Sequence, residues 1–275
     1  MEQTLKKTRL VGFLNQKGGI GKTSTAINLA TAIWYDKDLN WDVILWDCDV
    51  PQYSSANLRK KDIIDLEYVM EITDKGKMKG MIKQLKKYED IITFRGNSPS
   101  YPIRAINNNE YFEDSDRTSN YLADRIKQDL GKYDIILIDL PGNLSTPETI
   151  TLLPYMDYIM VPIDYDPLSL DSSKLTLKFL EQYNLDKKRS APAVDKENVY
   201  IYFSKWKKTS SLRNKEYAEN DAKKDFSFVK SFSHVINEAE NIKSTNLKSL
   251  LVLPDGVFNN AHFEEFYNEF IDKIL

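Results

Sequence analysis

Residues 15–25 have the sequence NQKGGIGKTST, which follows a short apolar run at 10–14 and precedes apolar residues at helical spacing over 26–34. Glycines between a strand and a helix let backbone N–H groups close around phosphate oxygens, and the helix N-terminus adds partial positive charge. A lysine and a hydroxyl at the start of the helix suit the β and γ phosphates and a Mg²⁺ ion. The stretch therefore predicts a phosphate-binding loop, with Lys22 on the phosphates and Thr23 on the ion.

Further short apolar runs bounded by turn or charged residues predict buried parallel strands at 43–46, 135–138, 158–163, 199–203 and 250–253. Helical spacing of apolar residues is clearest at 26–34, 175–180 and 263–275. Strands that alternate with helices form right-handed βαβ units. We predict one domain over 1–275 with a three-layer, doubly wound α/β fold, in which helices cover both faces of a mostly parallel sheet.

The segment from Ser54 to Gly131 fits this pattern less well, because it is charged and has a lysine-rich stretch from Lys75 to Lys87. We predict helices in it and a strand near Ile91 to Phe94. Its role is left open, and partner specificity is one hypothesis for the lysine-rich stretch.

The composition restricts the class of protein. Hydrophobic residues make up 41% and charged residues 29% of the chain, as in soluble globular proteins. The formal charge of -3 means that any nucleic-acid binding needs a local basic patch. The single cysteine, Cys48, excludes an intrachain disulfide, and the first ten residues lack an apolar signal core. No run approaches the roughly 18 apolar residues of a membrane span, so we predict a cytoplasmic protein that is not integral to a membrane.

Acidic residues follow two of the predicted strands. Asp47 and Asp49 follow the strand at 43–46, and Asp139 ends the strand at 135–138, shortly before Gly142. The carboxyl ends of parallel strands border the crevice in which open α/β sheets bind ligands, and carboxylate oxygens suit Mg²⁺. Aspartates are also common caps and turn formers after strands, so a structural role is the alternative.

The loop departs from the strict pattern G-x-x-x-x-G-K-[ST], because Gln16 stands at the first glycine. Residues 17–23, KGGIGKT, instead resemble the deviant Walker A loop of the ParA/MinD family of ATPases. The resemblance implies that Lys17 reaches across a nucleotide-sandwiched dimer to the partner's phosphates, and that Lys17 and Lys22 are catalytic. The predicted ATP-binding residues of the loop are Lys17, Gly18, Gly19, Ile20, Gly21, Lys22, Thr23 and Ser24.

The same resemblance assigns roles to the acidic strands. The family has D-x-D-P-Q where this chain has DCDVPQ at 47–52, with Val50 inserted, so the path of this switch loop is open. By position, Asp49 orients the attacking water and Asp47 belongs to the metal shell. Asp139, in a Walker B-like strand, is a further Mg²⁺ ligand. Gly142 brings a backbone N–H to the γ phosphate, and Pro254 borders the adenine unless it belongs to an ordinary turn.

Family members differ in what they act on, and this chain resembles short ParA-type partition ATPases. No helix-turn-helix fits before residue 10, the acidic stretch 262–275 does not suit anionic lipid, and one cysteine excludes a nitrogenase-like iron protein. Candidate contacts to nonspecific DNA, with a solvated charged face as the alternative, are Lys205, Lys207, Lys208, Arg213, Lys215, Lys223 and Lys224.

The resemblance therefore implies a slow, partner-stimulated Mg-ATPase in plasmid, chromosome or mobile-element partition. It implies an ATP-dependent homodimer, nonspecific DNA binding and a ParB-like centromere-binding partner. Two alternatives stay open, a MinD-like positioning switch for a non-DNA cargo and an ATP-dependent small-molecule ligase on the same fold.

Overall fold

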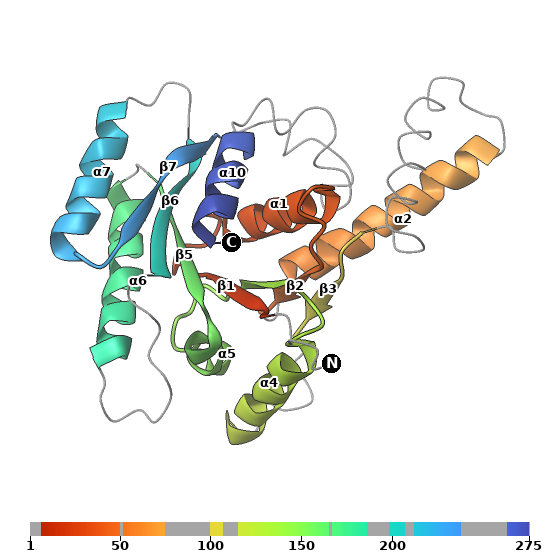
Figure 1. Ribbon diagram of the computed structural model, residues 1–275, viewed down its shortest axis with the longest axis horizontal. Coiled ribbons are helices and arrows are strands. Elements are labelled where there is room, and N and C mark those ends of the chain that lie inside the picture. Colours follow the sequence, from red (N-terminus) through yellow and green to blue (C-terminus); the bar gives the residue numbers. More distant parts are fainter. Residues whose placement is uncertain are drawn as a thin grey trace, which may run out of the picture.

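A single parallel sheet forms the centre of the protein. The computed structural model describes residues 7–49, 52–74, 100–106, 115–164, 167–185, 198–206, 212–237 and 263–274. Its strands are β1 (Arg9–Phe13), β2 (Val43–Asp47), β3 (Ile103–Ala105), β4 (Ile135–Asp139), β5 (Tyr158–Ile163), β6 (Val199–Trp206) and β7 (Lys230–Asn237). All of their pairings are parallel, in the order β3-β2-β4-β1-β5-β6-β7 (Figure 1).

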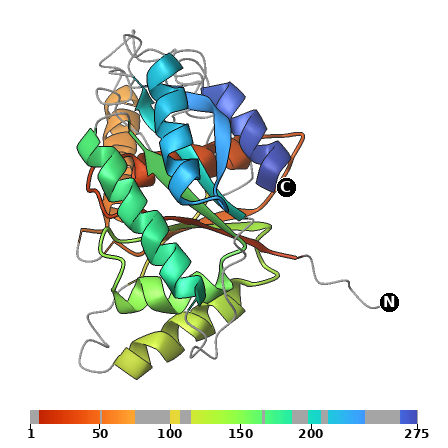
Figure 2. The same ribbon diagram turned by 90° about the vertical axis from the view of Figure 1, so that its left-hand side faces the viewer.

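Helices cover both faces of this sheet (Figure 2). They are α1 (Lys22–Tyr35), α2 (Ser54–Asp74), α4 (Ser115–Asp129), α5 (Pro147–Leu152), α6 (Pro167–Leu185), α7 (Leu212–Asp225) and α10 (Phe263–Ile274), and a 3-10 turn spans Leu153–Tyr155. Helices α1 and α10 share one apolar core with the sheet, whereas α4, α5, α6 and α7 share the other. The predicted three-layer α/β fold is confirmed.

The central strands are formed by apolar runs that bury both faces. Every residue of β2 and β4 is buried, as are four of the five residues of β1. Successive side chains in a strand point to opposite faces, so the two cores alternate along β4: Ile136 belongs to one cluster and Leu137 to the other. Continuous apolar runs therefore predict these strands to within a residue or two.

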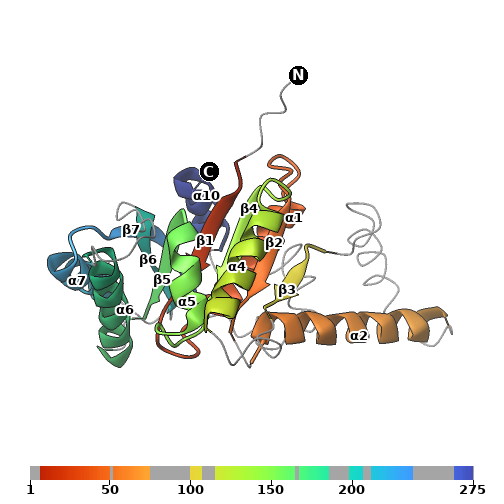
Figure 3. The ribbon, with the colours of Figure 1, turned by 90° about the horizontal axis from the view of Figure 1, so that it is seen from below.

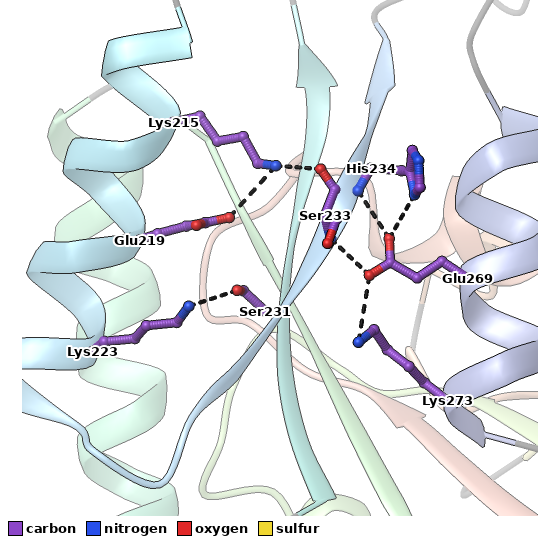
Figure 4. Close-up of polar contacts among 8 residues, drawn as sticks. All are labelled: Lys215, Glu219, Lys223, Ser231, Ser233, His234, Glu269 and Lys273. Atoms are coloured by element: carbon purple, nitrogen blue, oxygen red, sulfur yellow. Dashed lines mark hydrogen bonds and ion pairs between the residues drawn. The ribbon is translucent and has the colours of Figure 1, made fainter.

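Two edge strands escaped the sequence prediction. Strand β3 has only three residues, none fully buried. Among the β7 side chains that the structure describes, residues 230–236, only Phe232 and Ile236 are buried, and the pairing of β7 with β6 shifts register near Phe203. At this irregularity the Glu269 carboxylate of α10 accepts hydrogen bonds from the backbone N–H groups of Ser233, at 2.7 Å, and His234, at 2.9 Å (Figure 4). An exposed, bulged strand lacks the apolar run that sequence patterns detect.

Helix α2 begins beside the carboxyl end of β2 and extends away from the sheet beyond β3 (Figure 3). Helices were predicted in this region, and α2 and α4 confirm them. The strands expected at 91–94 and 250–253, and the lysine-rich stretch 75–87, lie outside the described residues.

Candidate functional site

A cavity of about 800 Å³ opens at the carboxyl ends of β1, β2 and β4. Three segments that are far apart in the sequence line it: the predicted phosphate loop, the start of α2 and the turn after β4. The lining residues are Gln16, Gly18, Gly19, Ile20, Gly21, Lys22, Thr23, Ser24, Ile27, Asp49, Gln52, Ser54, Leu58, Pro141, Gly142, Asn143 and Thr146. The fold thus brings most of the predicted site residues to one cavity.

Backbone conformation at two glycines shapes the phosphate loop. Gly19 has φ 69° and Gly21, which caps α1, has φ 106°. Side chains other than glycine rarely adopt these values. A Cβ at Gly21 would also lie 3.2 Å from the Ser204 side chain, whose hydroxyl donates a hydrogen bond to the Ile20 carbonyl. Strand β6 therefore supports the loop from beneath, and the loop requires glycine at position 21.

Lys22 is the first residue of α1 and its side chain turns back into the loop. Its Nζ donates a 3.0 Å hydrogen bond to the Asn15 carbonyl. Lys22 is buried, and burial lowers the pKa of its ammonium, against the attraction of Asp139 and Asp49. A buried ammonium in a fixed position can form strong charge-assisted hydrogen bonds to an anion such as phosphate.

Asp139 ends β4 directly below the loop and is completely buried. Neither of its carboxylate oxygens has a hydrogen-bond partner in the described part of the chain. Burial raises the pKa of Asp139 to about 7, against the Thr23 hydroxyl and the Lys22 ammonium, which act to lower it. Thr23 lies close enough to lower this pKa, but its geometry falls short of a hydrogen bond. A buried, unsatisfied carboxylate costs free energy unless a cation or donor meets it.

Asp47 pairs in register with Asp139 on the neighbouring strand, but its surroundings are different. One of its oxygens accepts hydrogen bonds from the backbone N–H groups of Ser55 and Ala56, both at 2.9 Å, and the other accepts one from Asp49 at 3.3 Å. The contacts to Ser55 and Ala56 satisfy N–H groups in the first turn of α2, which is the role of a helix cap. The metal role of Asp47 stays a prediction beside this observed structural role.

Asp49 lines the cavity and is half-buried. Burial raises the pKa of its carboxyl, and the Lys22 ammonium acts in the opposite direction. Gly142 also lines the cavity, and a Cβ on it would come within 3.1 Å of the Gln16 carbonyl oxygen. The turn after β4 therefore lies against the phosphate loop, and glycine permits that approach. Val50 and Pro51 lie outside the described residues.

Asn15 is a further residue of the site, which the sequence motifs do not indicate. Its side chain is fully buried beneath the loop. The amide donates hydrogen bonds to the Pro162 carbonyl, at 2.8 Å, and to the Ser173 hydroxyl, at 2.9 Å. The amide oxygen accepts from the Lys17 N–H at 2.8 Å. These partners lie 2 to 158 residues away, so no local pattern could have revealed the network.

Other predicted residues lie apart from this cavity. Lys17 is half-buried and outside the lining, and Pro254 falls outside the described residues. Among the DNA candidates, Arg213, Lys223 and Lys224 are exposed on α7. Lys223 donates to the Ser231 hydroxyl, while Lys215 contacts Glu219 and the Ser233 carbonyl (Figure 4). Lys205 lies in β6, and Lys207 and Lys208 are outside the described residues.

The described residues lack two features, a metal-binding cluster and a membrane-spanning helix. They contain no cluster of three or more His, Cys, Asp or Glu side chains arranged to hold a metal ion. Mg²⁺ commonly uses one or two protein carboxylates together with waters and substrate phosphates, so Asp139 with Thr23 fits such an ion. None of the helices in these residues is long and apolar enough to cross a bilayer.

Comparisons with known proteins agree with this geometry. A family model described as an AAA domain matches residues 8–191. The chromosome partitioning protein ParA of Myxococcus xanthus is 25% identical over 61% of this chain, and the chromosome-partitioning ATPase Soj of Thermus thermophilus is 26% identical over 64%. The matched parts span 56% and 63% of these relatives, which is less than two thirds of either length.

Solved structures of low identity share the fold. McdA of Cyanthece without nucleotide has a TM-score of 0.64 at 18% identity, with 98% of this chain and 100% of that one covered. A plasmid partition protein of Borrelia burgdorferi bound to AMPPNP has a TM-score of 0.57 at 20% identity, with 98% of this chain and 100% of that one covered. The pNOB8 ParA bound to nonspecific DNA has a TM-score of 0.58 at 17% identity, with 97% of this chain and 98% of that one covered. With its deviant phosphate loop, its parallel sheet and its match to the family model, this chain belongs to the AAA-domain ATPases of the ParA/MinD family.

Proposed function

We propose that this chain is a ParA-type partition ATPase that binds and hydrolyses Mg-ATP in the cavity above β1, β2 and β4. The observation that carries the proposal is the convergence on a glycine-rich loop of Lys22, Asp49 and the Asp139 carboxylate, which has no hydrogen-bond partner among the described residues. The loop N–H groups and Lys22 suit the phosphates of a nucleotide, and the Asp139 carboxylate suits a cation that prefers oxygen ligands. The partition relatives and the AMPPNP-bound neighbour support this choice of nucleotide.

The proposed roles follow from what each side chain faces. Lys22 would leave the Asn15 carbonyl for the phosphates and stabilise the charge that develops on the transferring group. Lys17, outside the cavity lining, would reach the phosphates of a second copy of the chain. Asp49, half-buried in the lining, would orient the attacking water. Thr23 and Asp139 would hold Mg²⁺, which neutralises phosphate charge when bound.

The cellular role is the finer part of the proposal. An ATP-dependent homodimer would bind DNA without sequence preference, and a ParB-like partner would stimulate slow hydrolysis. One neighbour is a ParA bound to nonspecific DNA. In this chain, however, four acidic residues of α7 balance its four basic ones. The DNA contact therefore needs a direct test.

The decisive experiment measures mass and DNA retention together. Wild type, Asp49→Ala, Lys17→Ala and the control Lys132→Ala are passed over a sizing column with and without Mg-ATP and nonspecific duplex DNA. Lys132 is exposed at the opposite end of the sheet, just before β4. We expect Asp49→Ala to accumulate as an ATP-dependent dimer that retains DNA, Lys17→Ala to stay monomeric and Lys132→Ala to match wild type. If ATP changes neither mass nor DNA retention in wild type, the partition role is wrong.

A second candidate function is a positioning switch for a non-DNA cargo, because McdA and MinD structures are also neighbours in fold. In that case ATP would still drive dimerisation, whereas duplex DNA would not co-elute with the Asp49→Ala dimer. The same column therefore separates the two functions.

A further inference from the structure

The side chain of Asn15 uses its full hydrogen-bonding capacity. A primary amide has two N–H donors and two oxygen lone pairs. The donors bind the Pro162 carbonyl and the Ser173 hydroxyl, and the oxygen accepts from the Lys17 N–H and, at 3.2 Å, from the Ser172 hydroxyl. Such complete pairing of a fully buried amide fixes its orientation, because any rotation leaves polar groups unpaired.

Helix α6 supplies most of this anchorage. Ser173, fully buried, also donates to the Pro162 carbonyl at 3.1 Å, which ties the end of β5 to the same hydroxyl. One turn later, the buried Thr176 hydroxyl accepts from the Gln16 N–H at 3.3 Å and donates to the Ser172 carbonyl at 3.1 Å. Hydroxyl groups of a single helix therefore hold Asn15 and Gln16 directly, and they hold Lys17 through the Asn15 side chain.

Asn15 makes a hydrogen bond with each of the two lysines of the proposed mechanism. The Asn15 side chain holds the Lys17 N–H, and the Asn15 backbone carbonyl holds the Lys22 ammonium. A loop whose N–H groups already point at the phosphate position binds more tightly than one that must order first, because apparent affinity scales with the fraction of competent protein.

We propose that Asn15 and Ser173 are positioning residues, which preset the nucleotide-binding conformation of the phosphate loop from helix α6. The role rests on the proposed function, since it requires that the loop binds nucleotide phosphate. Part of the nucleotide affinity would then depend on residues that do not line the cavity.

The test compares Ser173→Ala with a matched control, Thr8→Val. Thr8 is a buried hydroxyl that donates to the Tyr133 carbonyl at 2.7 Å and accepts from the Gly131 N–H at 2.8 Å, at the opposite end of β1. Each variant loses a buried hydroxyl that both donates and accepts a hydrogen bond, so both should lower the melting temperature. Only Ser173→Ala should weaken the binding of Mg-ATP and Mg-ADP. Both dissociation constants should rise by a similar factor of about five, which corresponds to the loss of one hydrogen bond of about 1 kcal/mol.

Amide hydrogen exchange gives a second readout without nucleotide. Ser173→Ala should speed exchange at the Lys17 N–H, and Thr8→Val should leave it unchanged. Thr176→Val, which keeps the shape but removes the acceptor of the Gln16 N–H, should repeat the affinity loss if Ser173→Ala proves too unstable to purify. Unchanged dissociation constants in the Ser173 and Thr176 variants, with wild type binding normally, would overturn the positioning role alone. A wild-type protein that bound neither nucleotide would overturn the proposed function with it.

Discussion

Replacing Asp139 by asparagine should stabilise the nucleotide-free protein at neutral and alkaline pH. Its carboxylate is completely buried and its oxygens have no hydrogen-bond partner in the described part of the chain. Burial raises its pKa from 3.8 to about 7. A raised acid pKa means that the native state binds more protons than the unfolded state between these values, so stability falls as pH rises through that window and is constant above it.

The shift sets the size of the effect. Three pKa units correspond to about 4 kcal/mol of destabilisation at pH 8, of which about 1–2 kcal/mol is already present at pH 5. Asparagine does not ionise, but its own unpaired amide costs about 1–3 kcal/mol at every pH. The net gain at pH 8 is therefore about 2 kcal/mol, and the difference between the variant and wild type should grow by about 3 kcal/mol from pH 5 to pH 8.

Urea unfolding in EDTA at several pH values from 5 to 8 measures this difference directly. Asp47→Asn is the matched control, because the two carboxylates are equally buried register partners on adjacent strands. Three backbone N–H groups donate to Asp47, so an amide there loses acceptors and should lower the free energy of unfolding at pH 8. If Asp139→Asn were less stable than wild type at pH 8, or if the difference did not change with pH, the Asp139 carboxylate would have to be solvated or paired.

Three further predictions test other parts of the structure. Glu269→Gln should lower the melting temperature at pH 7 by a few degrees, because burial, which acts to raise the pKa of this carboxyl, is outweighed by hydrogen bonds from the Ser233 and His234 backbone and the His234 ring, which lower it. That stabilisation is present above the ordinary pKa of 4.5 and is lost as pH falls through the lowered native-state pKa, so the variant and wild type should converge in acid. Gly21→Ala should cost about 1–2 kcal/mol in urea unfolding and weaken Mg-ATP binding, and wild-type values for both would contradict the φ of 106°. Tyr202→Phe should leave the free energy of unfolding unchanged or raise it by up to about 1 kcal/mol, since the buried hydroxyl lies near Thr25 but has no partner with hydrogen-bond geometry in the described residues. A clear loss of stability would mean that the Thr25 contact is a hydrogen bond.

The fold was largely predictable because its central strands carry the strongest pattern that a sequence can offer. Residues 135–138 and 43–46 are unbroken apolar runs, and the structure buries every one of them. The edge strands carry no such run. In β7, serines and a histidine interrupt the apolar residues Phe232 and Val235. The Glu269 carboxylate, 35 residues after His234, accepts hydrogen bonds from backbone N–H groups of the strand. Because contacts between residues far apart in the sequence stabilise this strand, local periodicity could not predict it.

The site was predictable to the same depth. The glycines, Lys22 and Thr23 form a local motif, because one strand-to-helix turn must supply all of these groups to the phosphates. The Asn15 anchorage to α6 was not predictable, since its partners lie 147 to 158 residues away and are hydroxyl and carbonyl groups of a common kind. A buried amide becomes recognisable as part of a site only when the fold shows what it holds.

Asp47 and Asp139 show most sharply what the sequence leaves undecided. Both are aspartates at the ends of buried strands, and they lie in register with each other. After β2 the chain turns into α2, whose first N–H groups reach Asp47 and satisfy it. After β4, Pro141 and Gly142 line the cavity, and Asp139 lies near Thr23 and Lys22 with no hydrogen bond from any residue that the structure describes. The element that follows each strand thus sets the chemistry of its aspartate. We therefore expect a divalent cation to stabilise wild type and to lose its effect in Asp139→Asn, while Asp47→Asn, although less stable, still responds to the ion.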